Sequence, residues 1–562
     1  MTEENTETKE QVGFLAQIGQ LTPMFWIANG SEALERLAFF GVRAVLPLYM
    51  VGMNSVLHLS MTEKGIIYGV WALIQCLLPM ISGGYTDAYG YRKSLVVAFS
   101  LNALGYALMA SILTLAGDSH ALRFWLMMTA GGLVGTGTAI FKPPVQGMVA
   151  KELTEGNSGL GFGIFYWVVN IGGFFAPMAA AFLRGDEASP TWSNVFYGAA
   201  IVTVINLIYC MIIFKEPDKD PEAAKKSSVR VFVDTMGQLW KDQRMFRFLL
   251  IISGFWLMFM QVWDLLPNFI DEWVDARDFG SLLTSVLGDG ASGFLTAEGA
   301  AKPEVMINID ALTIIILVIP LSAFFGRYRM VVSLVLGMVI AMVGFVGAGV
   351  TQVGNIVAIF IFVFAVGEII CSPKFTEFVG MTAPPDKKAQ YMGYSNMPFA
   401  FGWFVGNIIS GPLYDAFSSK VMLARRYLVE HLGMSADWAQ SEDTLHGQAV
   451  WDTYLARLNE TAPEALRPVA ERAGEMLRAI DPATLSSAEI GQRTHEALAP
   501  LKALQGEQDP FAASELLWNA YDPWIIWLIL GSVGLLSVFG MVMMYFRKKD
   551  DGAAEDAGES AE

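Results

Sequence analysis

Charged residues are scarce in this chain, and cysteine is nearly absent. Asp, Glu, Lys and Arg make up 16% of the 562 residues, whereas 54% are hydrophobic, and the mean hydropathy is +0.44. About 25% charged residues is usual in soluble proteins, so the composition favours a membrane protein. The three cysteines lie in or beside apolar segments at unrelated spacing, which argues against a disulfide framework or a metal cluster: Cys76, Cys210 and Cys371.

Other signatures are lacking as well. The five histidines lie in loops or near span ends, so a histidine proton relay within the membrane has no support. There is no phosphate-binding glycine loop, metal-ligand spacing or nucleophile arrangement, so we expect neither an enzyme nor a cofactor or metal. The formal net charge is −17, but the acids gather near both termini and in 418–522. That distribution indicates a solvated surface, and nucleic acid is not an expected partner.

Long apolar segments dominate the chain and recur from residue 23 to residue 546. Roughly 20 apolar residues form one helical crossing of a bilayer. We therefore predict an all-α membrane protein with about twelve transmembrane helices in two six-helix halves. The expected spans are 23–51, 62–85, 93–116, 121–150, 158–183, 192–214, 246–274, 306–325, 330–350, 354–381, 390–416 and 522–546.

Basic residues predict the orientation, because Lys and Arg accumulate in cytoplasmic loops. They fall on one side if both termini are cytoplasmic, as expected for a protein of the plasma membrane, here a bacterial inner membrane. The predicted organisation is a cytoplasmic segment 1–22, a first half 23–214, a charged linker 215–245, a second half 246–546 and an acidic cytoplasmic tail 547–562.

The stretch 418–521 interrupts the second half between spans eleven and twelve. Apolar residues recur at helical spacing from Leu466 to Ile480, which predicts short amphipathic helices in an outward-facing cap or a domain that docks a protein partner. The loop 275–303, which is rich in Gly and Ser, is predicted to be flexible.

The first span contains four charges, Glu32, Glu35, Arg36 and Arg43. Each costs about 2.5–3.5 kcal/mol near the bilayer centre, so such residues are usually functional. Their spacing of three, four and seven residues places them along one helical stripe, which must face the bundle interior or a wet cavity. A self-satisfied structural pair of Glu32 with Arg36 is the alternative.

Three further ionisable residues lie deep in spans: Lys142, Asp310 and Glu368. Lys142 precedes Pro143 and Pro144, where we expect the helix to break and to free carbonyls toward the cavity. Lys142 and Glu368, from opposite halves, are predicted to pair until a proton or a substrate charge separates them, which would couple proton uptake to substrate binding. A static strut is the alternative interpretation.

The loop after the second span carries a recognisable motif. Gly83, Asp87, Gly90, Arg92 and Lys93 resemble the Gly-x-x-x-Asp-x-x-Gly-x-[Arg/Lys]-[Arg/Lys] loop of the major facilitator superfamily. That resemblance implies that Asp87, Arg92 and Lys93 hold the two halves together on the cytoplasmic side. A tight turn with positive-inside anchors is the simpler explanation.

Several spans together resemble one family. Glu32 to Gly41 is similar to the first-span signature Glu-x-x-Glu-Arg-Phe-x-Tyr-Tyr-Gly of the proton-dependent oligopeptide transporter family, and Phe165 to Gly172 to its fifth-span signature Phe-Tyr-x-x-Ile-Asn-x-Gly. Gly135-Thr136-Gly137 with Lys142, and Val366-Gly367-Glu368 with Pro373, resemble its fourth and tenth spans.

The resemblance implies a role for each matching residue. Glu32, Glu35, Arg36 and Glu368 would take part in proton coupling, and Arg43 and Lys142 would hold a substrate carboxylate. Asn170 would contact a peptide backbone, Glu368 would hold the amino terminus, and Trp256 belongs to an aromatic pair in the seventh span. Asp310 is counted with the substrate-binding residues, and Asp264 is expected either to pair with Arg43 as an outer gate or to lie at the interface.

Departures from the pattern weaken the expectation of dipeptide specificity. Phe39 and Phe40 replace two tyrosines, Phe259 or Met260 stands where a glutamate is expected, and Asp310 lies where the family often has an asparagine. We therefore expect a proton-coupled symporter of small peptides or of a related zwitterionic or anionic solute. The alternatives are an exporter or exchanger of another metabolite, or a non-transporting membrane sensor or assembly subunit.

Overall fold

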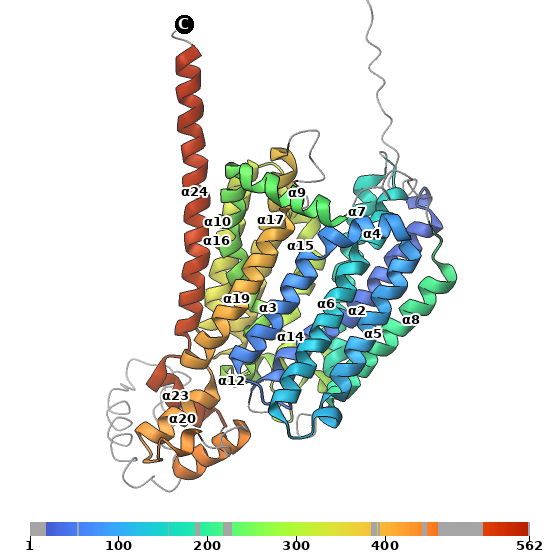
Figure 1. The fold of residues 1–562 in the computed structure, drawn as a ribbon. Helices are drawn as coiled ribbons and strands as arrows, with labels where there is room; N and C mark the ends of the chain where they lie inside the picture. Colours follow the sequence, from blue (N-terminus) through green and yellow to red (C-terminus); the bar gives the residue numbers. More distant parts are fainter. Residues whose placement is uncertain are drawn as a thin grey trace, which may run out of the picture.

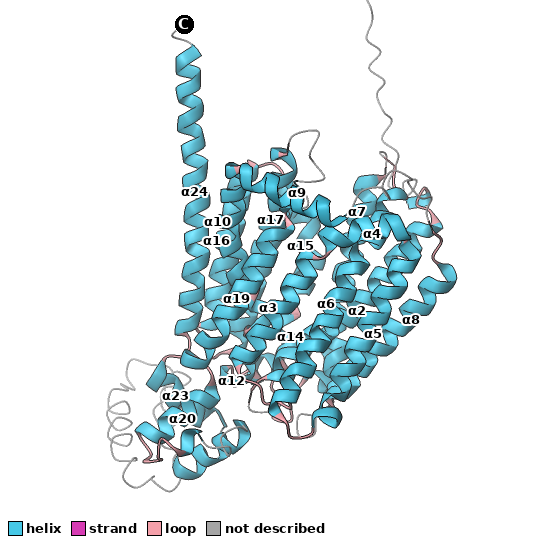
Figure 2. Cartoon of the chain, in the orientation of Figure 1, coloured by secondary structure: helices cyan, strands magenta, loops and turns pink. Residues whose placement is uncertain are grey.

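The structure, a computed structural model, describes residues 18–52, 55–154, 157–185, 191–216, 228–383, 391, 394–440, 447–458 and 510–559. Helices make up this part of the chain, and the only β-type pairing within it is two isolated bridges. Figure 2 shows the helices side by side in one elongated bundle. The predicted all-α fold is confirmed.

The first half of the chain contributes six spans, all close to their predicted bounds. The second span is divided in two, because Leu78 and Pro79 separate its parts. The helices are α2 (Pro23–Met50), α3 (Met61–Leu77) with α4 (Pro79–Tyr89), α5 (Tyr91–Ala116), α6 (His120–Lys151), α7 (Ser158–Arg184) and α8 (Trp192–Ile213).

The second half also contributes six spans, after the linker helix α9 (Ser228–Lys241). Its helices are α10 (Gln243–Phe259) continued by α11 (Gln261–Asp264) and α12 (Leu266–Trp273), α14 (Pro303–Ile307) with α15 (Ile309–Phe325), α16 (Met330–Gly349), α17 (Gly354–Thr382), α19 (Asn396–Phe417) and α24 (Ile525–Glu559). By length and hydropathy, ten helices of the described part can cross a membrane, and α2 and α19, which lie in the same bundle, bring the number to twelve.

The two halves form separate groups of packed helices. In the first half α5 packs on α6 and α8, and α2 packs on α7 and α8; in the second, α16 packs on α17 and α10 packs on α19 and α24. The halves meet mainly where α3 packs along α19 and where α7 crosses α15 (Figure 1). Residues near these two contacts therefore face both halves.

Glycines allow α3 and α19 to approach closely. A Cβ atom on Gly65 of α3 would lie 2.3 Å from the carbonyl oxygen of Asn407, and one on Gly411 of α19 would lie 2.5 Å from the carbonyl oxygen of Met61. Both obstacles are backbone atoms, which no side-chain rotation can move away. Small residues at such crossings are the usual means of packing helices within a membrane.

Substituting Gly65 by alanine is therefore expected to separate α3 from α19. We expect Gly65→Ala to lower the melting temperature of the purified protein by several degrees, because overpacking costs about 1–3 kcal/mol. Gly132→Ala is the matched control, since a Cβ on this helical glycine of α6 meets nothing within 4 Å. Equal melting temperatures for the two variants would contradict the proposed close packing.

The bundle has two distinct ends, shown in Figure 1. We call the end with α9 and the last turns of α24 the linker end, and the end with α12, α20 (Lys420–Glu430) and α23 (Pro510–Tyr521) the insertion end. The insertion 418–521 is helical at its described edges, as predicted; residues 466–480 lie outside the described part.

The insertion is docked on the second half through aromatic and polar contacts. The Trp273 indole donates to the Ser418 carbonyl at 2.8 Å, and the Lys420 amine lies 5.7 Å from the centre of the Trp273 ring. Glu272 accepts hydrogen bonds from the Tyr414 hydroxyl at 3.0 Å and the Lys420 amide at 3.2 Å. Burial lowers the pKa of the Lys420 amine to about 8. Glu272 and Lys420 are only 2% and 6% exposed, so the contact between the insertion and α12 is tightly packed.

Two local predictions were wrong. The stretch 275–303 contains helix α13 (Arg277–Leu287) and a 3-10 helix η2 (Gly288–Phe294), so it is largely ordered. Helix α6 continues through Pro143 and Pro144 to Lys151. Prolines are tolerated inside membrane helices where neighbouring groups can satisfy the freed carbonyls. The last span is confirmed: the apolar part of helix α24 that can cross a membrane is Ile525–Tyr545, and the helix itself continues to Glu559.

Candidate functional site

The charged stripe of α2 forms a buried cluster in the first half. The Arg36 guanidinium lies 3.1 Å from Glu32 and also contacts Glu35, and none of the three side chains is more than 7% exposed. The rings of Phe39 and Phe40 lie 5.1 Å and 5.4 Å from the same guanidinium. Two acids thus share one cation in an apolar environment, so the cluster itself has one carboxylate in excess.

Neighbouring helices position this cluster. The Thr138 hydroxyl of α6 donates to Glu35 at 3.3 Å. Gly172 of α7 leaves space for the Arg36 side chain. A Cβ atom at this position would lie 2.8 Å from the Arg36 Cβ, which is too close. The first-span and fifth-span motifs identified from the sequence therefore meet in space, and the glycine of one makes room for the arginine of the other.

Lys142 lies near this cluster and not against Glu368. The Lys142 amine is within electrostatic range of Arg36, Glu32 and Glu35, and within the described part it takes part in no ion pair. The predicted pair of Lys142 with Glu368 is therefore wrong for this conformation. Depth along a helix can be predicted from the sequence, but the direction of a side chain around the helix depends on tertiary packing.

Asp310 and Glu368 form a second polar group in the other half. Asp310 is 2% exposed in the first turn of α15, and Glu368 is half-buried in α17, which packs against α15. Asp310 Oδ1 and Glu368 Oε2 are buried without a hydrogen-bond partner in the described part of the chain. Within the described residues, Lys142 in one half and these two carboxyls in the other therefore form no ion pair.

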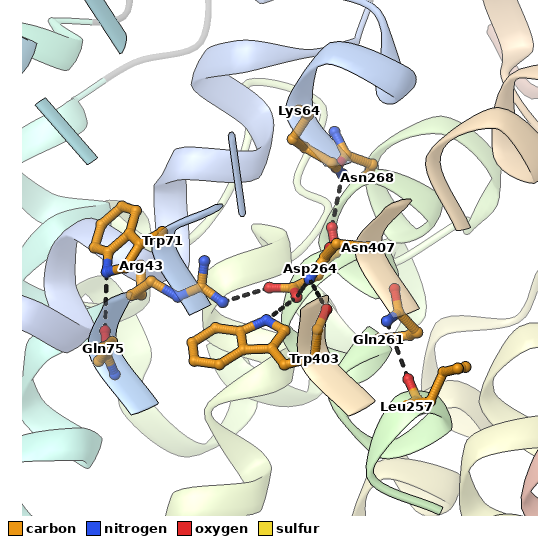
Figure 3. A network of polar contacts seen from close by, with 10 residues as sticks. All are labelled: Arg43, Lys64, Trp71, Gln75, Leu257, Gln261, Asp264, Asn268, Trp403 and Asn407. Carbon is orange, nitrogen blue, oxygen red and sulfur yellow. Dashed lines mark hydrogen bonds and ion pairs between the residues drawn. The ribbon is translucent and has the colours of Figure 1, made fainter. Parts of the chain in front are cut away.

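Figure 3 shows the polar network between the halves near the insertion end. Arg43 of α2 forms an ion pair with Asp264 of α11, which is fully buried. The indole of Trp403 and the amide of Asn407, both from α19, donate to the other Asp264 oxygen at 2.5 Å and 2.8 Å. We call Arg43, Asp264, Trp403 and Asn407 the outer network. Asp264 therefore lies buried at the contact between the halves, at the end of the candidate span Gln243–Asp264.

Lys64 extends the outer network toward the insertion end. Its amine donates to the Asp264 carbonyl and to the Asn268 side chain, both at 2.7 Å. The Asn268 amide in turn donates to the carbonyls of Pro47 and Val51 at the end of α2. Lys64, at 1% exposure, was missed in the sequence because it lies close to the expected start of a span, where lysine is ordinary.

Two more polar links join the halves at this end. Asp415 of α19 caps the start of α3, accepting from the amides of Met61 at 3.3 Å and Thr62 at 3.0 Å and from the Thr62 hydroxyl at 2.8 Å. The Arg184 side chain at the end of α7 lies 3.4 Å from Glu304 of α14. Neither link has a sequence signal beyond charges near helix ends. Together with the outer network, they close the bundle at the insertion end.

Asn170 and Trp256 are not drawn into either charged group. The Asn170 amide donates to the carbonyl of Tyr166 in its own helix at 2.8 Å. Trp256 is 2% exposed, and its ring packs 4.0 Å from Phe399 and 4.8 Å from Phe259. Trp256 Nε1 has no hydrogen-bond partner in the described part. Both positions stay predictions as substrate contacts.

A family model describes most of this arrangement. The model of the Major Facilitator Superfamily matches residues 36–407, from the α2 cluster to the outer network. The chain belongs to this superfamily. Among curated relatives, the multidrug resistance protein MdtH of Salmonella paratyphi B is 22% identical over 383 residues, which covers 67% of this chain and 84% of the relative.

Solved structures share the superfamily fold at low sequence identity. The nucleoside transporter NupG has a TM-score of 0.56 and 14% identity, over 77% of this chain and 99% of that one. A POT family transporter in complex with 5-aminolevulinic acid has a TM-score of 0.55 and 15% identity, over 80% and 96%. Tetrameric PepTSo2 has a TM-score of 0.53 and 17% identity, over 80% and 98%.

The loop motif of the superfamily lies at the linker end. Asp87 is in α4, and its side chain is outside the described part. The amides of Tyr91 and Arg92 donate to Glu216 at 2.6 Å and 2.9 Å, the Arg92 guanidinium contacts the Met211 carbonyl, and Lys93 is exposed. Arg92 thus fastens the start of α5 to the end of α8 within the first half, and a gating role for the motif stays a prediction.

Proposed function

We propose that this superfamily member is a proton-coupled symporter of small peptides or of a related zwitterionic or anionic solute. The observation that carries the proposal is the division of unpaired charge between the halves. Lys142 stands beside the Glu32, Glu35 and Arg36 cluster in one half, and in the other half Asp310 and Glu368 have no cation partner among the described residues. A solute with a carboxylate at one end and an ammonium at the other could pair with Lys142 in one half and with Asp310 and Glu368 in the other.

Coupling follows from the excess carboxylate beside Arg36. When a substrate carboxylate approaches Lys142 and Arg36, it weakens the attraction that holds Glu32 and Glu35 ionised, and one of them then binds a proton more readily. By linkage, a proton bound first favours the substrate carboxylate to the same degree. Protons moving down their gradient would thereby bring the solute with them.

Alternating access would use the links at the insertion end as the outward gate. With both termini in the cytoplasm of a bacterial inner membrane, the insertion end faces outward, and Arg43, Asp264, Asp415 and Lys64 hold that side closed. Outward opening then requires all of these links to separate as the halves rock apart. The docked insertion moves with the second half and remains a candidate surface for a protein partner.

Reconstitution tests the proposal directly. Purified protein in liposomes is expected to accumulate a labelled dipeptide when the interior is alkaline, and to lose that accumulation when a protonophore dissipates the gradient. Empty liposomes serve as the control for leakage. Uptake that is indifferent to the imposed proton gradient would overturn the coupling.

A second candidate, proton-driven export of drug-like compounds, is favoured by the similarity to MdtH and by Phe39 and Phe40, which offer no hydroxyl to orient a peptide. The two candidates differ in the direction of flux. Vesicles with the protein inserted cytoplasmic side out, energised with an acidic lumen, are expected to show no accumulation of a hydrophobic cationic dye. If the dye accumulates and added peptides do not inhibit its accumulation, the exporter is favoured.

A further inference from the structure

Asp310 and Glu368 lie where the two halves cross. Asp310 begins α15 just after Asn308, whose amide donates to the Phe174 carbonyl of α7 at 2.8 Å. Glu368 lies on α17, which packs against α15, and both carboxyls are within electrostatic range of Tyr166 on α7. Asp310 and Glu368 of the second half thus lie together next to the first half, where α7 crosses α15.

Neither carboxyl is compensated by the protein. Within the described residues no basic side chain lies within ion-pair distance of Asp310 or Glu368, and each has an oxygen without a hydrogen-bond partner. The amide oxygen of Asn308, which is 5% exposed, also lacks a partner. In contrast, Glu32 and Glu35 share Arg36, and Asp264 has Arg43. A charge left alone at such depth costs several kcal/mol, so each carboxyl must either hold a proton or meet a cation from outside the protein fold.

The chemistry of the pair favours an organic cation as that partner. Among described residues no group of three or more His, Cys, Asp or Glu side chains is placed to hold a metal ion, and hard cations prefer six or more oxygen ligands. Ammonium and guanidinium groups need only a few acceptors, which two carboxylates and the neighbouring Tyr166 hydroxyl supply. Two carboxylates also match a solute with two positive charges better than a solute with a single positive charge.

We propose that Asp310 and Glu368 form a two-carboxylate site for solutes that carry two positive charges at the end remote from their carboxylate. The inference rests on the proposed function, in which Lys142 binds the solute's carboxylate. A single acid at Glu368 would suit any free amino terminus, whereas Asp310 adds a preference for a second ammonium or guanidinium nearby. Asp310 is then the residue that determines specificity among zwitterionic solutes.

Lysyl-glycine and norleucyl-glycine provide a matched pair of probes, because they differ in the side-chain ammonium and share the aliphatic chain. Peptide binding to the full-length protein in detergent can be measured from the rise in melting temperature as the peptide is titrated. This measurement needs no proton gradient. We expect lysyl-glycine to bind about tenfold more tightly, the equivalent of roughly 1.4 kcal/mol. Asp310→Asn is expected to bring the two affinities within about twofold of each other by weakening lysyl-glycine alone.

Glu298→Gln is the control for this substitution, since it neutralises an exposed acid near the insertion end and is expected to leave the ratio unchanged. Equal affinities of the wild type for both peptides, or an unchanged ratio in Asp310→Asn, would overturn the inference while leaving peptide transport intact. Binding of 1,5-diaminopentane that depends on Asp310, without binding of either peptide, would support the site and reject peptides as substrates. Sodium chloride and choline chloride test for an alkali cation. If only sodium chloride stabilises the protein, and Asp310→Asn abolishes this stabilisation, the pair binds an alkali cation and the proposal is overturned.

Discussion

Asp264→Asn is expected to open the insertion end of the bundle. The substitution leaves Arg43, which is 8% exposed, without its counter-ion when the halves are closed, whereas in an open state water can solvate the guanidinium. Leaving one member of a buried pair uncompensated costs about 3–5 kcal/mol. Because 1.4 kcal/mol is a factor of ten, the equilibrium between closed and open states is expected to shift about 100-fold or more toward the open state.

Thiol labelling measures this shift. A cysteine at Gln75, which is 6% exposed and lies beyond Arg43 in α3 (Figure 3), reports access through the outer network in a background without the three native cysteines. A membrane-impermeant maleimide added from outside is expected to react rapidly with the Asp264→Asn variant and slowly with its parent. Transport by Asp264→Asn is expected to fall in parallel, since the closed state is needed to complete a cycle.

The control removes both charges at once. Arg43→Met combined with Asp264→Leu replaces the ion pair by apolar side chains of similar size, a change that is often neutral for stability. This double variant is expected to label nearly as slowly as the parent. If the single variant labels no faster than the parent, or if the double variant labels as fast as the single one, an uncompensated Arg43 is not what opens the gate.

The main features of the fold and the α2 cluster could be predicted from the sequence because their signals are local. Long apolar runs predict the spans, and a stripe of four charges in one such run is costly enough to require an interior position. Gly402 and Gly406, four residues apart, were another available signal. A Cβ on either would lie within 3 Å of α10 or α11 atoms, which is the small-residue packing pattern of membrane helices.

Contacts between the halves could not be predicted in the same way. Asp415 and Lys64 lie near helix ends, where charged residues are ordinary, and only the tertiary arrangement shows that they bridge α19, α3 and α11. The pairing of Lys142 with Glu368 failed for a related reason. Both residues lie at suitable depth in opposite halves, but their directions around α6 and α17 depend on packing that periodicity does not specify.

Glu35→Gln is expected to separate solute movement from proton movement. Of the two acids beside Arg36, Glu35 alone also accepts from Thr138 of α6, the helix that carries Lys142. A hydrogen bond thus links Glu35 to the helix whose Lys142 binds the substrate carboxylate in the proposed mechanism. With glutamine there, the cluster has one carboxylate and one guanidinium and no excess acid to protonate, so proton-driven accumulation should end with equal solute concentrations on both sides of the liposome membrane.

Exchange distinguishes this outcome from simple loss of the protein. Solute counterflow, which needs no net proton movement, is expected to persist in Glu35→Gln, and a pH-sensitive dye in the lumen should report no solute-induced acidification. Glu430→Gln in the exposed part of α20 is the matched control and should retain both activities. Glu32→Gln leaves the same balance of one carboxylate and one guanidinium, so it is expected to end proton-driven accumulation as well. Proton-driven accumulation that survives in Glu35→Gln would place the coupling elsewhere, with Asp310 and Glu368 as the remaining uncompensated carboxyls of the described bundle.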